Sequence, residues 1–315
     1  MQTAFTELVG CAHPLQQAAM GGVATPELAG AVSRAGGLGM LCEYGPEPAT
    51  ERMASALEIA GEGAPLGMGF FGQWIDTDLE TFEVAANWLR VVEVFWSQPD
   101  PAVVQRARRS GSALVAWQVG STDDAEAAED AGCDFLIAQG VEAGGHVRGT
   151  VPRDALLRMV LSHVRIPVVA AGGIATADDV AAVIAAGATA ARVGTRFVAT
   201  EESSAHPAYI DALCRTSSGE DTLLTTTFSG GWPDAPHRVL RSAVDTADAY
   251  DGDVVGHVVH EGVRRPIPVF SAAPPTTETE GDIAAMALYA GFGVGSVDDV
   301  RPAADVVKEL VSRLG

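Results

Sequence analysis

The sequence predicts an α/β fold, and three observations support this prediction. Eight short apolar runs recur along the first 200 residues, helix signals lie between successive runs, and glycine-rich turns follow several runs directly. The runs start 21 to 33 residues apart, about the length of one βα unit. Eight strands with helical crossovers favour a (β/α)8 TIM barrel over a doubly wound sheet, which usually has about six strands.

The expected strands are short and several are almost continuously apolar, as parallel strands covered on both faces should be. They are Pro14–Met20, Leu38–Cys42, Pro65–Phe71, Val91–Trp96, Ala113–Val119, Asp134–Gly140, Pro167–Ala171 and Ala191–Phe197.

The segments between the strands carry helix caps. Thr25 precedes Pro26, a proline in the first turn, and Gly36 follows as a stop signal. Ser121 begins a second helix that ends at Gly132, and Thr176 begins a third that ends at Gly187.

The pattern changes after residue 200. The Ser/Thr/Gly-rich stretch Thr216–Gly231 and the proline-rich stretch Pro266–Pro275 predict a small irregular cap. Helical periodicity returns in Asp282–Ala290 and Pro302–Leu314, which we expect to pack on the barrel. The predicted division is therefore residues 1–200 plus 281–315 for the barrel and 201–280 for the cap or substrate region.

Charge and composition exclude some partners. The chain carries 41 acidic and 20 basic residues, a net charge of −21, which argues against binding to nucleic acid or anionic membranes. No export signal, membrane-spanning run or disulfide framework is apparent, so we expect a cytoplasmic protein with reduced cysteines. His257, His260 and Glu261 lack the order of a zinc motif and predict a solvated turn, so no metal is expected.

Two glycine turns predict a phosphate site. Gly172 and Gly173 follow the seventh run, and Gly194 and Thr195 follow the eighth. Adjacent turns of this kind bring backbone N–H groups together at the place where barrels commonly hold a phosphate. The alternative is that these glycines only make tight turns.

The loop after the sixth run contains a candidate catalytic residue. Gln139 and His146 enclose a segment with Gly144 and Gly145, where bare backbone permits close approach of a flat or phosphorylated ligand. A histidine in this position can take or give a proton, although a solvent-facing loop histidine is the alternative. Met20, after the first run, either lies against a planar ring or fills the core.

These motifs together resemble the nitronate monooxygenase (2-nitropropane dioxygenase-like) family of FMN-containing barrels. The matching stretches are Gln17–Gly39, Gln139–His146 (QGVEAGGH), Ala170–Phe197, Trp232–Arg241 and Tyr289–Gly291. The resemblance runs through nearly the whole chain, and QGVEAGGH is its most specific part.

The resemblance implies a set of cofactor contacts. Gly173 and the segment Arg192–Thr195 would hold the FMN phosphate, Gln139 and Gly144 would contact the cofactor, and Met20 would lie by the flavin ring. His146 would face the substrate. The full cofactor-binding set that we predict is Met20, Gly21, Gln139, Gly144, Gly145, Gly172, Gly173, Arg192, Val193, Gly194 and Thr195.

The implied activity is oxidation of small nitronates, nitroalkanes or similar acidic carbon centres with O2, His146 serving as base or hydrogen-bond donor. Two alternatives remain: an FMN-dependent NAD(P)H enoyl-thioester reductase, and a flavin-free phosphate-binding barrel lyase or isomerase. Gly69 and Phe292 replace polar residues common in the family, so the substrate stays open. The sequence leaves the oligomeric state open, with a homodimer as one option.

Overall fold

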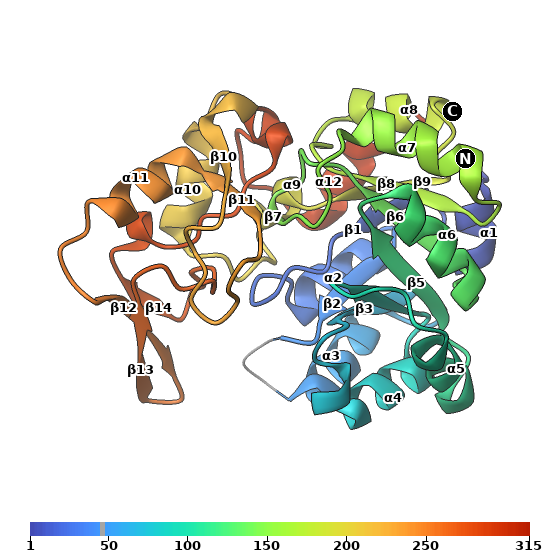
Figure 1. Cartoon of the computed structure of the whole chain (residues 1–315), viewed down its shortest axis with the longest axis horizontal. Coiled ribbons are helices and arrows are strands. Elements are labelled where there is room, and N and C mark those ends of the chain that lie inside the picture. The colour runs from blue at the N-terminus through green and yellow to red at the C-terminus, as the bar shows by residue number, and fades with distance from the viewer. Residues whose placement is uncertain (45–47) are drawn as a thin grey trace.

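The chain folds around an eight-stranded parallel sheet that curls almost into a closed barrel (Figure 1). The computed structural model describes residues 1–44 and 48–315. The strand order is β1-β9-β8-β6-β5-β4-β3-β2, and a parallel bridge between Gln16 and Leu38 brings the two ends of the sheet together. The predicted barrel is thus confirmed. Its strands are β1 (Leu15–Gln17), β2 (Gly39–Cys42), β3 (Leu66–Phe71), β4 (Val91–Phe95), β5 (Leu114–Val119), β6 (Phe135–Gln139), β8 (Val168–Ala171) and β9 (Ala190–Val193).

Helices surround this sheet, and the predicted caps form. The Thr25 hydroxyl accepts the N–H of Leu28, Ser121 accepts that of Asp124, and Thr176 forms a reciprocal capping box with Asp179. The short helix α1 (Ala4–Val9) lies at the amino-terminal end of the barrel, where Phe5 packs edge-on against Phe135. The outer helices are α2 (Pro26–Arg34), α3 (Ala49–Ala60), α4 (Leu79–Trp88), α5 (Pro101–Ser110), α6 (Thr122–Ala131), α7 (Arg153–His163), α8 (Ala177–Ala185) and α12 (Ala303–Leu310).

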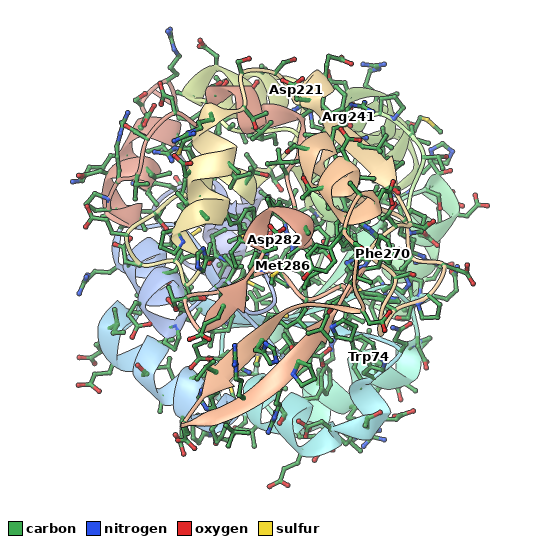
Figure 2. The ribbon with its side chains drawn as sticks, turned by 90° about the vertical axis from the view of Figure 1, so that its left-hand side faces the viewer. Trp74, Asp221, Arg241, Phe270, Asp282 and Met286 are labelled. Carbon is green, nitrogen blue, oxygen red and sulfur yellow. The ribbon has the colours of Figure 1, made fainter. Side chains whose placement is uncertain are left out.

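Residues 205–294, called the second unit below, form a body beside the barrel with its own buried core (Figures 1 and 2). The prediction of an irregular cap is corrected here, because the unit contains regular elements. The regular elements are α10 (Pro207–Arg215), β10 (Thr222–Thr225), β11 (His237–Leu240), α11 (Arg241–Asp248), β12 (Val254–His260), β13 (Val263–Pro268) and β14 (Thr279–Gly281). β11 pairs with Gly145 and His146, far earlier in the chain, and β14 pairs with β12, so little local signal marks these two strands, whereas β12 and β13 form a local hairpin.

The segment after residue 281 also differs from the expectation. Instead of a helix over Asp282–Ala290, there is one turn of 3-10 helix, Ile283–Ala285, followed by extended chain. The consecutive residues 285–288 are all buried in the second unit, which one face of an amphipathic helix cannot achieve. This segment packs in the second unit, whereas α12 packs against the barrel, as predicted. In the described part of the chain, no helix has the length and apolar character needed to cross a membrane.

A polar network crosses the inside of the barrel. Glu93 on β4 pairs with the guanidinium of Arg192 on β9, and its other carboxylate oxygen accepts the side-chain amide of Gln16 at 3.0 Å. Both charged side chains are almost fully buried, so each depends on the other for the interaction that water would otherwise provide.

We predict that Glu93→Ala lowers the free energy of unfolding by about 3–5 kcal/mol, because it leaves the buried Arg192 charge without its partner. Glu83→Ala is the matched control: Glu83 pairs with Arg106 on the surface, and its loss should cost less than about 1 kcal/mol. Chemical denaturation measures both. Equal effects for the two variants would contradict the structural role of the buried pair.

Candidate functional site

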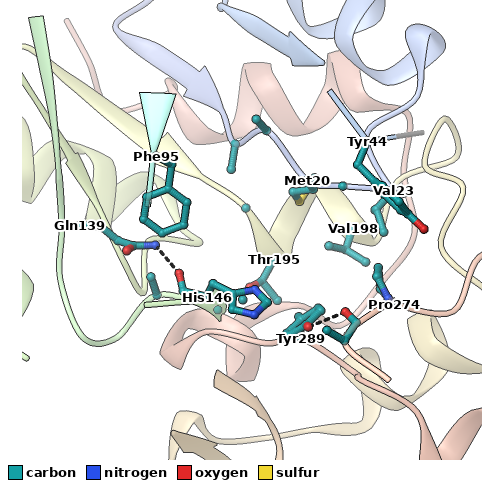
Figure 3. Close-up of a pocket in the computed structure, with 18 of the residues that line it drawn as sticks. Met20, Val23, Tyr44, Phe95, Gln139, His146, Thr195, Val198, Pro274 and Tyr289 are labelled. Atoms are coloured by element: carbon teal, nitrogen blue, oxygen red, sulfur yellow. Dashed lines mark hydrogen bonds between the residues drawn. The ribbon is translucent and has the colours of Figure 1, made fainter. Parts of the chain in front are cut away.

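A pocket of about 450 Å³ opens at the carboxyl ends of the barrel strands, against the second unit (Figure 3). Barrel enzymes place their active sites at this end. Every residue of the predicted site lines it except Val193. Val193 is fully buried in the barrel wall, and its carbonyl accepts the N–H of Ala18. The second unit contributes a further side of the pocket through Tyr209, Gly230, Gly231, Trp232, Ser271, Ala272, Ala273, Pro274, Tyr289 and Gly293.

One end of the pocket is bare backbone. Gly172 and Gly173 have φ angles of +114° and +65°, which residues with a Cβ adopt only at a cost. A Cβ built on Gly194 would meet only Ala18 at 3.5 Å and Met20 at 4.0 Å, which is ordinary contact. The turns after β8 and β9 therefore leave an open cradle at the place where the sequence predicts a phosphate.

Gly144 has a structural reason for its lack of a side chain. A Cβ there would lie 2.5 Å from the backbone nitrogen of Gly291, so the loop after β6 and the segment after Tyr289 touch through their backbones. The hydroxyl of Thr195 strengthens the same junction, because it accepts the N–H of Gly291 at 3.0 Å. Two of the stretches that carry the family resemblance, Gln139–His146 and Tyr289–Gly291, thus pack directly on each other.

His146 is held between the two parts of the molecule. It lies on β7 (Gly145–His146), which pairs antiparallel with β11 so that His146 stands opposite His237. The side-chain amide of Gln139 donates to the backbone carbonyl of His146 at 3.1 Å (Figure 3). The loop position that the sequence indicates is therefore fixed by a strand pairing with the second unit.

The imidazole of His146 is buried against an indole. Its ring stacks on Trp232 with centroids 3.9 Å apart and planes 23° from parallel. Its Nε2 atom is buried and has no hydrogen-bond partner among the described residues. Burial, with a smaller contribution from His237, lowers the pKa of His146 from 6.5 to about 3. The ring is therefore neutral at physiological pH and retains an unused polar atom.

Aromatic side chains form a continuous wall beside His146. Phe71, Trp74, Phe95 and Trp232 line the pocket and contact one another, and Trp96 packs edge-on against His146 and Trp232. Trp96 takes the left-handed conformation, with φ of +64°, which is unusual for a bulky residue. Trp117 lies outside this wall: it is fully buried, and its indole donates to the carbonyl of Ser97.

The arginines near the phosphate turns are both engaged elsewhere. Arg192 lines the pocket, yet its guanidinium pairs with Glu93 in the barrel interior. Arg196 is buried and bonds the carboxylate of Asp299 at 2.8 Å, so its charge is balanced there and not directed to the turns. Among the described lining residues, Arg192 alone carries a formal charge, and Glu93 balances it.

Gly69 and Phe292, which replace polar residues common in the family, each have an explanation in their local surroundings. A Cβ on Gly69 would lie 2.6 Å from the Cβ of Ala19, so the chain after β1 occupies the space that a side chain would need. Phe292 lies under the guanidinium of Arg238, 4.7 Å from its centre, in a cation–π contact.

The histidines of the β12–β13 hairpin do not gather as metal ligands would. His260 instead bonds the carboxylate of Glu278 at 2.6 Å. In residues 1–44 and 48–315, no group of three His, Cys, Asp or Glu side chains could hold an ion.

A family model described as nitronate monooxygenase matches residues 2–73 and 77–313. The chain belongs to the nitronate monooxygenase family. A nitronate monooxygenase from Pseudomonas aeruginosa is 33% identical over 277 residues, covering 73% of this chain and 78% of that protein. Family membership makes the chain an enzyme, an oxidoreductase of the monooxygenase type.

Other relatives carry different names. A (3aS,4S,5R,7aS)-5-hydroxy-7a-methyl-1-oxo-octahydro-1H-indene-4-carboxyl-CoA dehydrogenase from Rhodococcus jostii is 31% identical, covering 82% of this chain and 71% of that protein. Among solved structures, a nitroalkane oxidase from Streptomyces ansochromogenes superposes with a TM-score of 0.75 at 30% identity, over 99% of this chain and 98% of that one. FabK from Thermotoga maritima gives 0.80 at 28% identity, over 99% and 96%.

We predict that the His146 imidazole stays neutral from about pH 5 to pH 8, because its lowered pKa postpones protonation until the pH approaches 3. Proton NMR of the ring hydrogens measures this, with the His146 signal assigned from its loss in His146→Asn. A chemical-shift change with a midpoint near 6.5 would contradict the burial of the ring.

Proposed function

We propose that this enzyme is an FMN-dependent nitronate monooxygenase that oxidises nitronates with O2. The observation that carries the proposal is the position of His146, a neutral imidazole with an unused buried nitrogen, in one pocket with the glycine cradle. This chemistry needs a polar group that can bind the substrate, which the Nε2 atom of His146 would supply. It also needs backbone N–H groups that can bind the phosphate of the cofactor, which the glycine turns would supply.

The pocket fits FMN by its residue types. The cradle of Gly172, Gly173 and Gly194 would take the phosphate, because backbone N–H groups hold an anion even in a strongly acidic chain. Met20 and Gln139, on the barrel side, would contact the rest of the cofactor. The chemistry that FMN supplies when bound is transfer of electrons from the substrate to O2.

His146 acts better as a hydrogen-bond partner than as a base. With a pKa of about 3 in the free enzyme, its conjugate acid is too strong for the neutral ring to deprotonate a nitroalkane readily. A nitronate is already deprotonated, and its negative charge would raise the pKa of His146 and strengthen the hydrogen bond to it. We therefore place the nitronate anion, rather than the nitroalkane, first among substrates.

The remainder of the substrate should be apolar. Phe71, Trp74 and Trp232 give the pocket an aromatic wall that excludes water, and the guanidinium of Arg192 is engaged with Glu93. A carboxylate on the substrate, in addition to the nitronate group, would find no unpaired positive side chain among the described lining residues.

A second candidate is an FMN-dependent enoyl-thioester reductase that takes hydride from NAD(P)H. The likeness to FabK and to a dehydrogenase named for a CoA thioester favours it. The flavin-free lyase or isomerase is not carried further, because the family is one of oxidoreductases.

Anaerobic mixing of the FMN-loaded protein separates the two candidates. We expect an alkyl nitronate to bleach the flavin absorbance quickly, a carboxylate-bearing nitronate of equal length to bleach it more slowly, and NADH or NADPH to leave it unchanged. His146→Ala should keep its flavin and lose roughly a hundredfold in bleaching rate, whereas His163→Ala, on an exposed face of α7, should behave as wild type. Bleaching by NAD(P)H but by no nitronate would replace the proposal with the reductase.

Gly194→Val should reduce FMN retention at least tenfold, because the added side chain enters the cradle. The backbone permits the change: φ of −112° is open to residues with a Cβ, and the nearest neighbours are in ordinary contact. Gly194→Ala, with one methyl group, should lose less. The ratio of flavin to protein after purification measures retention, and thermal melting of the apoprotein reports on folding. Full flavin content in Gly194→Val would refute the phosphate assignment.

A further inference from the structure

We propose that His237 is a positioning residue, whose imidazole ties down the loop that carries Trp232 and thereby fixes the ring of His146. The loop, Thr226–Pro236, joins β10 to β11 and reaches over the pocket. His237 does not itself line the pocket. The kinetic part of this inference rests on the proposed function, whereas its structural part does not.

Both ring nitrogens of His237 bond to the backbone of this one loop. Nε2 accepts the N–H of Phe228 at 3.2 Å, near the start of the loop, and Nδ1 lies 2.8 Å from the carbonyl of Ala235, near its end. A backbone N–H can only donate, so Nε2 must be unprotonated, and Nδ1 must carry the hydrogen that it donates to Ala235. The protein itself thus selects one neutral tautomer, and burial reinforces it by lowering the pKa of His237.

The position of His237 makes it suited to this task. It is fully buried and is the first residue of β11, the strand that pairs with His146 across β7. The two imidazole centroids lie 5.3 Å apart. β11 therefore fixes both the backbone of His146 and the end of the loop that carries Trp232. The two stacked rings, of Trp232 and His146, are supported by the same strand.

The loop needs these hydrogen bonds because part of its backbone adopts a conformation that is unfavourable in free energy. Asp234 has φ of +56°, a left-handed conformation that costs a non-glycine residue roughly 1 kcal/mol or more, and Gly231 has φ of +89°. Other bonds hold the middle of the loop, since Gly230 exchanges hydrogen bonds with Phe270 and Ala272. Trp232 lies between this middle anchor and the Ala235 end that His237 holds.

What the tie secures is the stack of Trp232 on His146. Trp232 is 8% exposed and covers one face of the imidazole, which keeps water from that face and limits its rotation. If the loop loosens, His146 gains freedom and solvent, and its hydrogen bond to a substrate is no longer preorganised.

Three variants test this role. His237→Phe keeps the size and removes both bonds, leaving Phe228 N–H and Ala235 C=O without their side-chain partner. His237→Gln keeps an acceptor near the position of Nε2 and serves as the conservative rescue. Thr227→Ala is the control within the loop. It removes a hydroxyl bond to Thr225 that does not involve His237, and the backbone N–H of Thr227 still donates to the hydroxyl of Thr225. All are prepared as FMN-loaded full-length protein.

The first measurement is hydrogen exchange of the backbone amides of residues 226–236, made without substrate. We expect His237→Phe to speed exchange roughly tenfold, the loss of about one buried hydrogen bond, with His237→Gln between it and wild type and Thr227→Ala unchanged. Wild-type exchange in His237→Phe would overturn the inference, whether or not any nitronate is turned over.

The second measurement is a kinetic cycle with Trp232→Leu, using an alkyl nitronate. His237→Phe should lower kcat about tenfold with KM and flavin content nearly unchanged, and adding it to Trp232→Leu should lower kcat no further, because both act through the same stack. Independent, multiplying effects would overturn the inference. Absence of turnover in wild type would count against the proposed function alone, since the exchange result still decides the role of His237.

Discussion

The two-residue pairing of β7 with β11 is the contact on which the candidate site depends. β7 is part of the loop after β6, and without a partner strand that loop would leave His146 at a flexible position above the barrel. The pairing sets His146 opposite His237, and the bond from Val147 N–H to the Pro236 carbonyl extends it. Beside this junction, Trp232 and Tyr289 of the second unit contact the ring of His146.

Charge is distributed so that the pocket stays nearly neutral within a chain of net charge −21. The one charged lining residue of the described chain, Arg192, is balanced by Glu93, and burial keeps His146 uncharged. An anionic ligand in the pocket would therefore meet backbone amides at the glycine turns and the neutral imidazole of His146, rather than a cluster of cations. In a buried, low-dielectric site such dipoles interact strongly with an anion without the desolvation cost of a free charge.

The sequence predicted the features that have local causes. Helix caps at Thr25, Ser121 and Thr176, the eight apolar runs and the glycine turns depend on neighbouring residues, and a strand forms within each run. The eighth run, Ala191–Phe197, was predicted too long, because β9 ends at Val193 and the helix α9 (Thr195–Val198) follows. β11, β14 and the extended segment near Met286 depend on partners that are not adjacent in the chain, so periodicity misled the prediction there. The β12–β13 hairpin is local, and the prediction missed it. The direction in which a side chain points could not be predicted from the sequence either.

The arginines and aromatic residues illustrate that last difficulty. Arg192 and Arg196 stand four residues apart beside one turn, yet the first faces the barrel interior and the second reaches Asp299. The aromatic wall joins residues after β3 and β4 with Trp232 from the second unit. Their positions at the carboxyl ends of β3 and β4 were a usable signal for Phe71 and Phe95, but nothing local pointed to Trp232 as the partner of His146.

The barrel and the second unit supply different parts of the pocket, and this difference helps to explain why relatives about 30% identical carry different names. The glycine cradle, to which we assign the phosphate in our proposal, is made of backbone, so it depends on the positions of the glycines. The surfaces that would meet the rest of a substrate, including Trp232 and Pro274, come from the second unit. Substitutions at Trp232 or Pro274 would reshape the pocket, whereas residues 291–293 of the same unit pack against the glycine turns. Differences in substrate between a nitronate monooxygenase and a CoA-thioester dehydrogenase are therefore expected in residues 205–294 more than in the barrel.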